Sequence, residues 1–341
     1  MPEVVVVGAG PIGLEVALRL MADGREVLVL DQGPIGNTIR TTFPPDTRFF
    51  SSPERIAIAG RVIPSADQEK TRGEDYLAYL RAVAESSEVP VRTYTRCLDV
   101  EGEAGDLRVK VSRTDDASRE ELLSATAVVL AVGGTHRSRR LGVPGEDLGF
   151  VHSRLRDPGD YYGRRVLVVG GRNSAAESAL RLYRAGARVA ISYRGPHLHD
   201  RVKFWIRPEV EGLLEEGRIA RFMPSVVERV LPGRVELSSP EGERQVQVDE
   251  VLLQIGFEQD SALFRRLGIP VLGPDRVPEY DHETMRTSRP GVFVAGTATA
   301  GTQSGFRVFI ENCHQHAERI AAALAGREPP EPVAARPLPE V

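Results

Sequence analysis

Three glycines follow a run of four valines near the start of the chain, in the stretch VVVVGAGPIGLE. Gly8, Gly10 and Gly13 have GxGxxG spacing, which allows a tight strand-to-helix turn and a close approach of backbone N–H groups to a pyrophosphate. Asp31 ends the next apolar run, EVLVLD, where a carboxylate can accept hydrogen bonds from ribose hydroxyls. The combination predicts a dinucleotide site, and the alternative is a glycine-rich turn without a ligand.

A second stretch, RVLVVGGRNSAAESALRLYRAG, repeats this order of strand, glycine turn and helix from Arg165 onward. Gly170 allows the turn and Ala175 can serve as the close-packing third position, but Arg172 replaces the middle glycine. The repeat indicates an internal duplication, with two nucleotide-binding units in one chain. Arg172 either folds away from the phosphates or contacts them.

The residues after the second strand of each unit differ in charge. Arg194, which follows Tyr193 at the end of RVAISYR, lies near the position that Asp31 has in the first unit. An acid there suits a 2′-hydroxyl and an arginine suits a 2′-phosphate. This contrast predicts an FAD site in the first unit and an NADPH site in the second, unless Arg194 is a solvated loop residue.

Apolar runs and glycine turns predict the elements that position these residues. Fully apolar runs at 4–7, 166–169 and 292–295 indicate buried parallel strands, and 73–86 has the spacing of an amphipathic helix. The fold class is therefore α/β, with two Rossmann-like, three-layer ββα dinucleotide-binding domains. We expect a discontinuous FAD domain at 1–150 and 259–327, an inserted NADPH domain at 151–258, and a flexible proline-rich tail at 328–341.

Composition narrows the functional classes. A net charge of -4 argues against nucleic-acid binding, and no apolar run approaches the length of a membrane span. The first strand begins at residue 4 without a signal peptide, so a cytoplasmic protein is expected. The two cysteines, Cys97 and Cys313, form no CxxC motif, and no metal-ligand spacing occurs. Cys313 is a weak candidate for a redox thiol, and a buried inert thiol is the alternative.

With these features the chain resembles the thioredoxin-reductase-like flavoproteins and, within that group, the YpdA-type bacillithiol disulfide reductases. The stretches that carry the resemblance are DTRFFSSPERIAIAG, PGED, GGRNSAAESALRLYRAGARV, KFWIRPEVEGLL and FIEN. The resemblance implies FAD and NADPH as cofactors, with hydride passing from NADPH to flavin and on to a low-molecular-weight thiol disulfide. It also implies a homodimer or homotetramer.

The resemblance implies roles for individual residues. The FAD site would include Gly8, Gly10, Pro11, Ile12, Gly13, Asp31, Gln32, Thr41, Phe50, Ser51, Gly133, Gly296, Thr297, Phe306, Arg307 and Val308. The NADPH site would include Gly170, Gly171, Asn173, Ser174, Tyr193 and Arg194.

Three departures from the family pattern limit what can be carried over. The stretch HSRLRDPGDYYG lacks the CxxC of thioredoxin reductases, and Gly296-Thr297 replaces a Gly-Asp pair. Ile12 stands where the bacillithiol disulfide reductases carry a cysteine. The main alternative is therefore a cysteine-independent reductase that passes electrons to ferredoxin, a quinone or oxygen. A flavin-bound sensor without turnover is a third possibility, which a glycine loop blocked by Arg172 would support.

Overall fold

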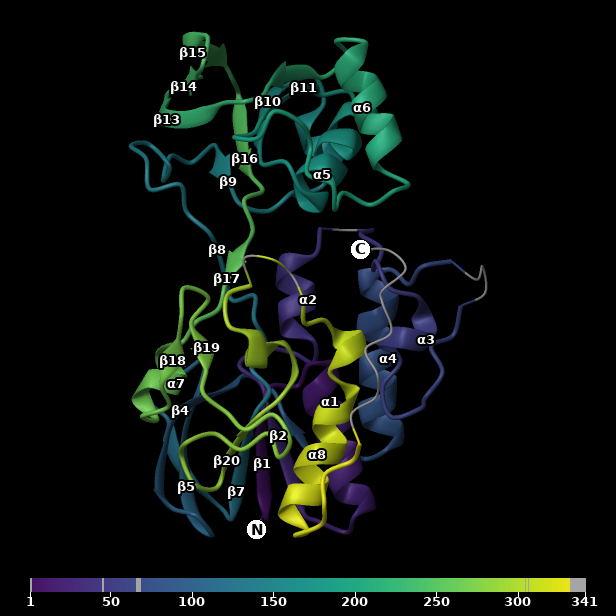
Figure 1. Ribbon diagram of the computed structural model, residues 1–341, viewed down its shortest axis with the longest axis vertical. Helices are drawn as coiled ribbons and strands as arrows, with labels where there is room; N and C mark the ends of the chain where they lie inside the picture. Colours follow the sequence, from purple (N-terminus) through teal and green to yellow (C-terminus); the bar gives the residue numbers. More distant parts are fainter. Residues whose placement is uncertain (1, 45, 66–68, 304, 306, 332–341) are drawn as a thin grey trace. The chain divides into compact units, whose positions relative to one another are not determined.

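The structure is a computed structural model that describes residues 2–44, 46–65, 69–303, 305 and 307–331. The chain divides into two compact units (Figure 1). The first comprises the residues up to Arg137 and again from Glu258, and the second comprises Ser138–Phe257. One α/β unit is thus inserted into the other, as expected. The tail from 332 onward lies outside the described residues.

The first unit is built on a five-stranded parallel sheet in the order β20-β7-β1-β2-β3. Its strands are β1 (Val4–Val7), β2 (Val27–Leu30), β3 (Val91–Arg92), β7 (Ala127–Leu130) and β20 (Val292–Val294). Val4 and Val6 pack into the core under the helices, whereas Val5 and Val7 pack into the core on the other face. Both faces are buried, which is why an uninterrupted valine run forms this strand.

Helices cover one face of this sheet and an antiparallel sheet covers the other. The helices on that face are α1 (Pro11–Ala22), α2 (Asn37–Thr42), α3 (Pro53–Ile56), α4 (Gly73–Ser86) and α8 (His314–Leu324), whereas α7 (Ala262–Arg266) packs with the antiparallel strands. The antiparallel strands are β4 (Thr95–Glu103), β5 (Asp106–Arg113) and β6 (Glu120–Ala125). The amphipathic helix expected at 73–86 is confirmed, and the expected three-layer arrangement is present. The smaller elements of this unit are β18 (Val271–Leu272), β19 (Val277–Pro278), η2 (Gly296–Ala300) and η3 (Ile310–Asn312).

The second unit repeats the plan with a parallel sheet in the order β12-β11-β10-β16-β9. Its parallel strands are β9 (Val151–His152), β10 (Arg165–Val169), β11 (Arg188–Ser192), β12 (Ala220–Phe222) and β16 (Glu250–Leu253). The remaining elements are η1 (Pro158–Tyr161), α5 (Asn173–Arg184), α6 (Arg207–Glu215), β13 (Val226–Leu231), β14 (Arg234–Ser239) and β15 (Gly242–Gln247). Val166 and Val168 face the helices, whereas Leu167 and Val169 face the antiparallel strands, so the same alternation builds both units.

The chain enters the second unit earlier than the expected boundary at 150/151. Leu141, Val143 and Leu148 already pack against the apolar core of the second unit, and Val230 N–H donates to the Pro144 carbonyl at 2.9 Å. These contacts come from residues far along the chain, so local sequence patterns do not reveal them. The two linking segments, β8 (Arg137–Ser138) and β17 (Phe257–Glu258), pair with each other. Among the described residues, no helix is long and apolar enough to cross a membrane.

Candidate functional site

The first glycine loop lies where β1 ends and α1 begins. Gly8 has a φ of +116°, and a Cβ placed there would lie 2.3 Å from the carbonyl oxygen of Ala131. A Cβ on Gly13 would lie 1.9 Å from the carbonyl oxygen of Gly8, whereas a Cβ on Gly10 would meet nothing within 4 Å. Gly8 and Gly13 are therefore required by packing within the protein. Gly10 borders open space, as a loop that receives a ligand would.

The N-terminus of α1 fits an anion. Gly10 is its N-cap and Pro11 occupies the first turn, and no side chain caps the helix within the described part of the chain. The first turn also carries no acidic residue. The unpaired N–H groups and the helix dipole therefore favour a negative group at this end. Together with the open space at Gly10, these features fit the pyrophosphate of a dinucleotide.

Asp31 follows β2 and supports the same loop. Its carboxylate accepts hydrogen bonds from the N–H groups of Ala9, at 2.9 Å, and Gly33, at 2.8 Å. Burial raises the pKa of Asp31, although both hydrogen bonds oppose that shift. Asp31 thus joins the glycine loop to the end of β2, while its role toward a ribose stays a prediction. The neighbouring Gln32 is exposed.

The loops after β7 and β20 meet at the same edge of the sheet. A Cβ on Gly133, whose φ is +79°, would lie 3.8 Å from the Thr297 hydroxyl oxygen. Gln259 is fully buried, and its amide nitrogen donates to the carbonyls of Gly133, at 3.1 Å, and Ala298, at 2.9 Å. Gln259 therefore clamps the two loops together. No sequence motif marks Gln259, so the sequence alone does not predict this role.

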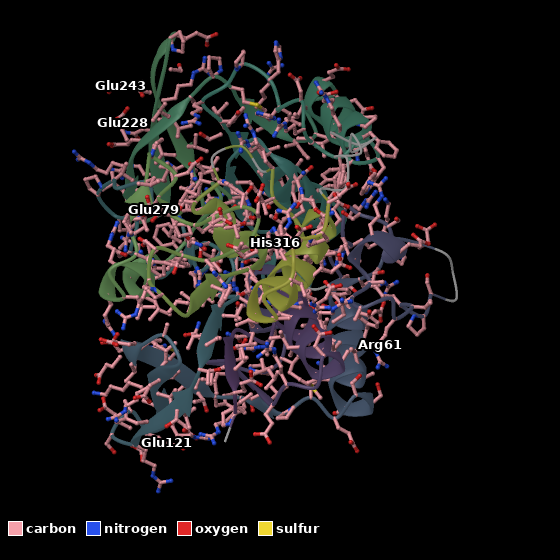
Figure 2. All side chains as sticks on the ribbon, turned by 60° about the horizontal axis from the view of Figure 1, so that its bottom comes forward. Arg61, Glu121, Glu228, Glu243, Glu279 and His316 are labelled. Atoms are coloured by element: carbon pink, nitrogen blue, oxygen red, sulfur yellow. The ribbon has the colours of Figure 1, made fainter. Side chains whose placement is uncertain are left out.

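Ile12 lies in the first turn of α1 and packs against the loop after β20. Only 4% of Ile12 is exposed, and a Cβ on Gly296 would lie 3.2 Å from the Ile12 Cβ. Gly296 N–H donates to Nδ1 of His316 at 3.0 Å. His316 lies on α8 (Figure 2). Burial lowers the pKa of His316 to about 4, which keeps the ring neutral and able to accept this bond. The structure thus brings Ile12, Gly296 and α8 together.

The remaining predicted residues of the first site lie in several loops. The Thr41 hydroxyl donates to the Asn37 carbonyl at 2.9 Å inside α2, so it is engaged locally. Ser51 is buried and Phe50 is half-buried. The N–H groups of Arg307 and Val308 both donate to the Gln303 side-chain oxygen at 2.8 Å, which fixes their turn. Phe306 lies outside the described residues.

Neither cysteine is an exposed thiol of low pKa. Cys313 is fully buried at the start of α8, and burial raises the pKa of its thiol. Burial likewise raises the pKa of the half-buried Cys97 to about 12. A thiol acts as a nucleophile only as the thiolate, so both side chains are poor candidates for disulfide exchange. The weak candidacy of Cys313 therefore finds no support in its surroundings.

The second glycine loop has the same backbone plan. A Cβ on Gly170, whose φ is +142°, would lie 2.4 Å from the Gln254 carbonyl oxygen and 3.1 Å from the Ala175 Cβ. Arg172 is the N-cap of α5 with φ −109° and ψ −172°, close to the values of −81° and −178° at Gly10. This extended conformation is open to any residue, so arginine causes no backbone strain here. The Arg172 residue is exposed.

Tyr193 covers the second loop. A Cβ on Gly171 would lie 2.3 Å from the Tyr193 ring, so only glycine allows this contact. Asn173 accepts a hydrogen bond from Lys203 N–H at 2.6 Å through its side-chain oxygen. Ser174 and Arg194 are exposed at the same end of the unit, and no side chain caps α5 among the described residues. The loop, the helix end and Arg194 together fit a phosphate-rich ligand.

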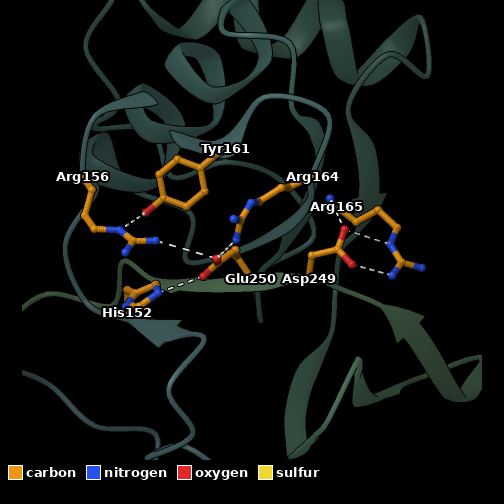
Figure 3. A network of polar contacts seen from close by, with 7 residues as sticks. All are labelled: His152, Arg156, Tyr161, Arg164, Arg165, Asp249 and Glu250. Carbon is orange, nitrogen blue, oxygen red and sulfur yellow. Dashed lines mark hydrogen bonds and ion pairs between the residues drawn. The ribbon is translucent and has the colours of Figure 1, made fainter. Parts of the chain in front are cut away.

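A separate polar network in the second unit surrounds Glu250 (Figure 3). Glu250, which is 5% exposed, contacts His152 at 2.8 Å, Arg156 at 3.7 Å and Arg164. Glu250 is the first residue of β16, whereas the glycine loop follows the last residue of β10. The network therefore braces the strand starts and is not part of the nucleotide site.

Two glycine loops, each between a parallel strand and a helix, are typical of proteins that bind two dinucleotides. The chain belongs to the pyridine nucleotide-disulphide oxidoreductase family, whose model matches residues 5–296. It is an enzyme of the oxidoreductase class. The family match and the similarity to solved structures of bacillithiol disulfide reductase and thioredoxin reductase confirm the resemblance inferred from the sequence.

Three individual proteins are similar to this chain along most of their length. The chain is 31% identical to the bacilliredoxin reductase Bdr of Bacillus subtilis (strain 168), over 96% of this chain and 98% of that protein. It is similar to the solved bacillithiol disulfide reductase Bdr (YpdA) from Bacillus cereus, with a TM-score of 0.89 and 30% identity, over 96% and 99% of the chains. A ferredoxin--NADP reductase from Ignicoccus hospitalis (strain KIN4/I / DSM 18386 / JCM 14125) is 27% identical, over 88% of this chain and 90% of that protein.

Proposed function

We propose that this protein is an NADPH-dependent FAD flavoprotein that reduces a low-molecular-weight thiol disulfide. One observation carries the proposal: each unit has a tightly packed glycine loop and a helix N-terminus that no described side chain caps, in a chain similar along its length to bacilliredoxin reductase Bdr. Bound FAD would accept hydride from NADPH and deliver electrons to the acceptor. We further propose a cytoplasmic homodimer or homotetramer, as the resemblance implies.

The residues of the first unit would bind and shape the FAD site. Gly10 and the N-terminus of α1 would receive the pyrophosphate, and Asp31 would face the ribose. Gln259 and His316 would hold the loops after β7 and β20 in place around Gly133 and Gly296. Preorganised loops of this kind orient a bound group without moving during the reaction.

The residues of the second unit would bind NADPH. Gly170, Gly171 and the N-terminus of α5 would receive its pyrophosphate, and Arg194 would pair with the 2′-phosphate. Ser174 and Arg194 are exposed at this end, as residues that meet a ligand must be. Arg172 has an ordinary extended backbone, which argues against a loop blocked by strain and so against a sensor without turnover.

A second function is favoured by a specific observation. Ile12 is buried where relatives are expected to carry a cysteine, and the thiols of Cys97 and Cys313 have raised pKa values. With no thiolate to attack a disulfide, electrons would leave the flavin directly. The acceptor would then be ferredoxin, a quinone or oxygen.

Spectroscopy of the purified protein separates these proposals. We expect a yellow protein with an FAD spectrum that bleaches when NADPH is added without oxygen. Absence of flavin, or of bleaching, would contradict both enzyme proposals. Where bleaching occurs, NADPH consumption is compared with bacillithiol disulfide, with a ferredoxin, with a quinone and with oxygen alone. Turnover only with the disulfide supports the first function, and turnover only with the other acceptors supports the second.

A further inference from the structure

Two neighbouring aromatic residues lie on the surface of the second unit, between β11 and α6. Phe204 is 68% exposed and Trp205 is 38% exposed. Their ring centroids are 4.9 Å apart at an interplanar angle of 89°. Large aromatic side chains gain free energy when a partner surface covers them, so an adjacent exposed pair is a candidate contact surface for a ligand.

Hydrogen bonds fix this segment beside the second glycine loop. His199 N–H donates to the Gly171 carbonyl at 2.8 Å, and Lys203 N–H donates to the Asn173 side-chain oxygen at 2.6 Å. Asn173 is the first residue of α5, so Lys203 touches the helix end that follows the glycine turn. The aromatic pair comes directly after Lys203 and is therefore held next to that helix end.

The Lys203 side chain also attaches the segment that carries Phe204 and Trp205 to α5. It is only 7% exposed, and its ammonium group lies 3.1 Å from a Glu177 carboxylate oxygen on α5. The same ammonium group lies 5.6 Å from the centroid of the Trp205 ring. A buried lysine that contacts both α5 and the indole restricts the position of Trp205. The exposed rings are thus part of an ordered surface beside the loop.

We propose that Phe204 and Trp205 form a stacking surface for a heteroaromatic ring of the bound pyridine dinucleotide. The inference rests on the proposed function, because it requires a dinucleotide at the second glycine loop. In such a ligand one ribose separates each ring from the pyrophosphate, so a pyrophosphate at the α5 N-terminus puts both rings within reach of nearby surfaces. Adenine and nicotinamide are both flat and stack on aromatic side chains, and the test distinguishes them.

Trp205 is the only tryptophan in the chain, so its fluorescence reports on this surface. The FAD-loaded protein is titrated with NADP⁺, which does not reduce the flavin, and Kd is measured in parallel by calorimetry. We expect saturable quenching of Trp205 with the calorimetric Kd. The fragments 2′,5′-ADP and nicotinamide mononucleotide then identify the ring, since the fragment that carries it reproduces the quenching. NADP⁺ binding without any change in Trp205 fluorescence overturns the inference.

Variants test the contribution of the rings to binding. Trp205→Leu and Phe204→Leu should each raise the Kd of NADP⁺ at least about fivefold, since stacking on an aromatic ring contributes this much or more. Trp205→Phe keeps an aromatic face and should retain most of the affinity, which separates stacking from misfolding. Tyr162→Leu is the matched control, because Tyr162 is 78% exposed in the same unit and packs against Gly186 instead.

The outcomes separate this inference from the proposed function. If the unaltered protein does not bind NADP⁺ in calorimetry, the proposed function fails. If it binds NADP⁺ and the Trp205→Leu and Phe204→Leu variants bind equally well, the stacking inference alone is wrong. The same holds if Tyr162→Leu weakens binding as much as they do.

Discussion

Substitution of single glycines in the first loop separates the needs of the fold from those of the ligand. In Gly10→Ala the new methyl group meets nothing within 4 Å, and the backbone at φ −81° and ψ −178° accepts alanine. Only the modest preference for glycine over alanine at a helix N-cap is lost, so the apoprotein should lose at most about 1 kcal/mol of unfolding free energy. The methyl group would instead occupy space that the pyrophosphate needs.

Gly13→Ala should behave in the opposite way. Its methyl carbon would lie 1.9 Å from the Gly8 carbonyl oxygen, which is backbone and cannot rotate away. Strain of this kind costs about 3 kcal/mol or more, so the apoprotein itself should be destabilised. Gly212→Ala is the control, because Gly212 lies inside α6 and a Cβ there meets nothing within 4 Å. It should stabilise the helix by roughly 0.5–1 kcal/mol.

Urea unfolding of the apoproteins and FAD titration measure the two effects independently. We expect Gly10→Ala to unfold close to the unaltered apoprotein but to bind FAD about 5- to 150-fold more weakly, which corresponds to roughly 1–3 kcal/mol for one misplaced methyl group. The reasoning is refuted if Gly10→Ala destabilises the apoprotein as much as Gly13→Ala does. It is equally refuted if Gly10→Ala binds FAD as tightly as the unaltered protein.

Four further predictions concern the charge of Arg194, the pH dependence of His316 and His314, and the missing thiol at Ile12. Arg194→Ala should abolish the preference for NADPH over NADH in kcat/KM, and an unchanged preference would disprove the 2′-phosphate assignment. Burial lowers the pKa of His316 from 6.5 to about 4, so the unfolded chain binds a proton in this range that the folded protein does not. The protein should therefore lose roughly 3 kcal/mol of stability as the pH falls from 6.5 to about 4, and His316→Gln should reduce that loss in pH-dependent unfolding. Burial disfavours the charged form of His314, but its 2.7 Å contact with Glu15 raises the pKa of His314 above 6.5. This contact should therefore stabilise the folded protein fully below pH 6.5 and progressively less above it. An equal effect of His314→Gln on stability at all pH values would argue against this. Ile12→Cys should raise disulfide-dependent NADPH consumption if the acceptor is a disulfide, and no increase would favour the cysteine-independent function.

Local patterns in the sequence predict most of the architecture. The two glycine loops, the helix at 73–86 and the buried strands follow from spacing and periodicity over a few residues, because turns and helices form from neighbours in sequence and a buried strand is marked by its own apolar run. The alternation of Val4 to Val7 between two apolar cores also follows from the two-residue period of a strand. The duplication was visible because each unit repeats the same order of strand, glycine turn and helix.

The start of the second unit was less predictable. Residues 139–150 look like a continuation of the first unit in sequence, yet Leu141, Val143 and Leu148 pack against the core of the second. That preference depends on strands β13 to β15, which come much later in the chain. A boundary set by distant packing partners leaves no mark in the local composition.

The sequence by itself determined the positions of the glycines and of Asp31 and Arg194, which follow the second strand of each unit. It also determined that position 12 is isoleucine and not cysteine. The tertiary structure decided how these residues are supported. Gln259 reaches Gly133 across 126 positions, and His316 accepts a hydrogen bond from Gly296 on another element. It also decided that Cys313 is buried and that Phe204 and Trp205 lie exposed beside a glycine loop. Burial and long-range hydrogen bonds depend on which surfaces meet when the chain folds, and spacing along the sequence does not specify that.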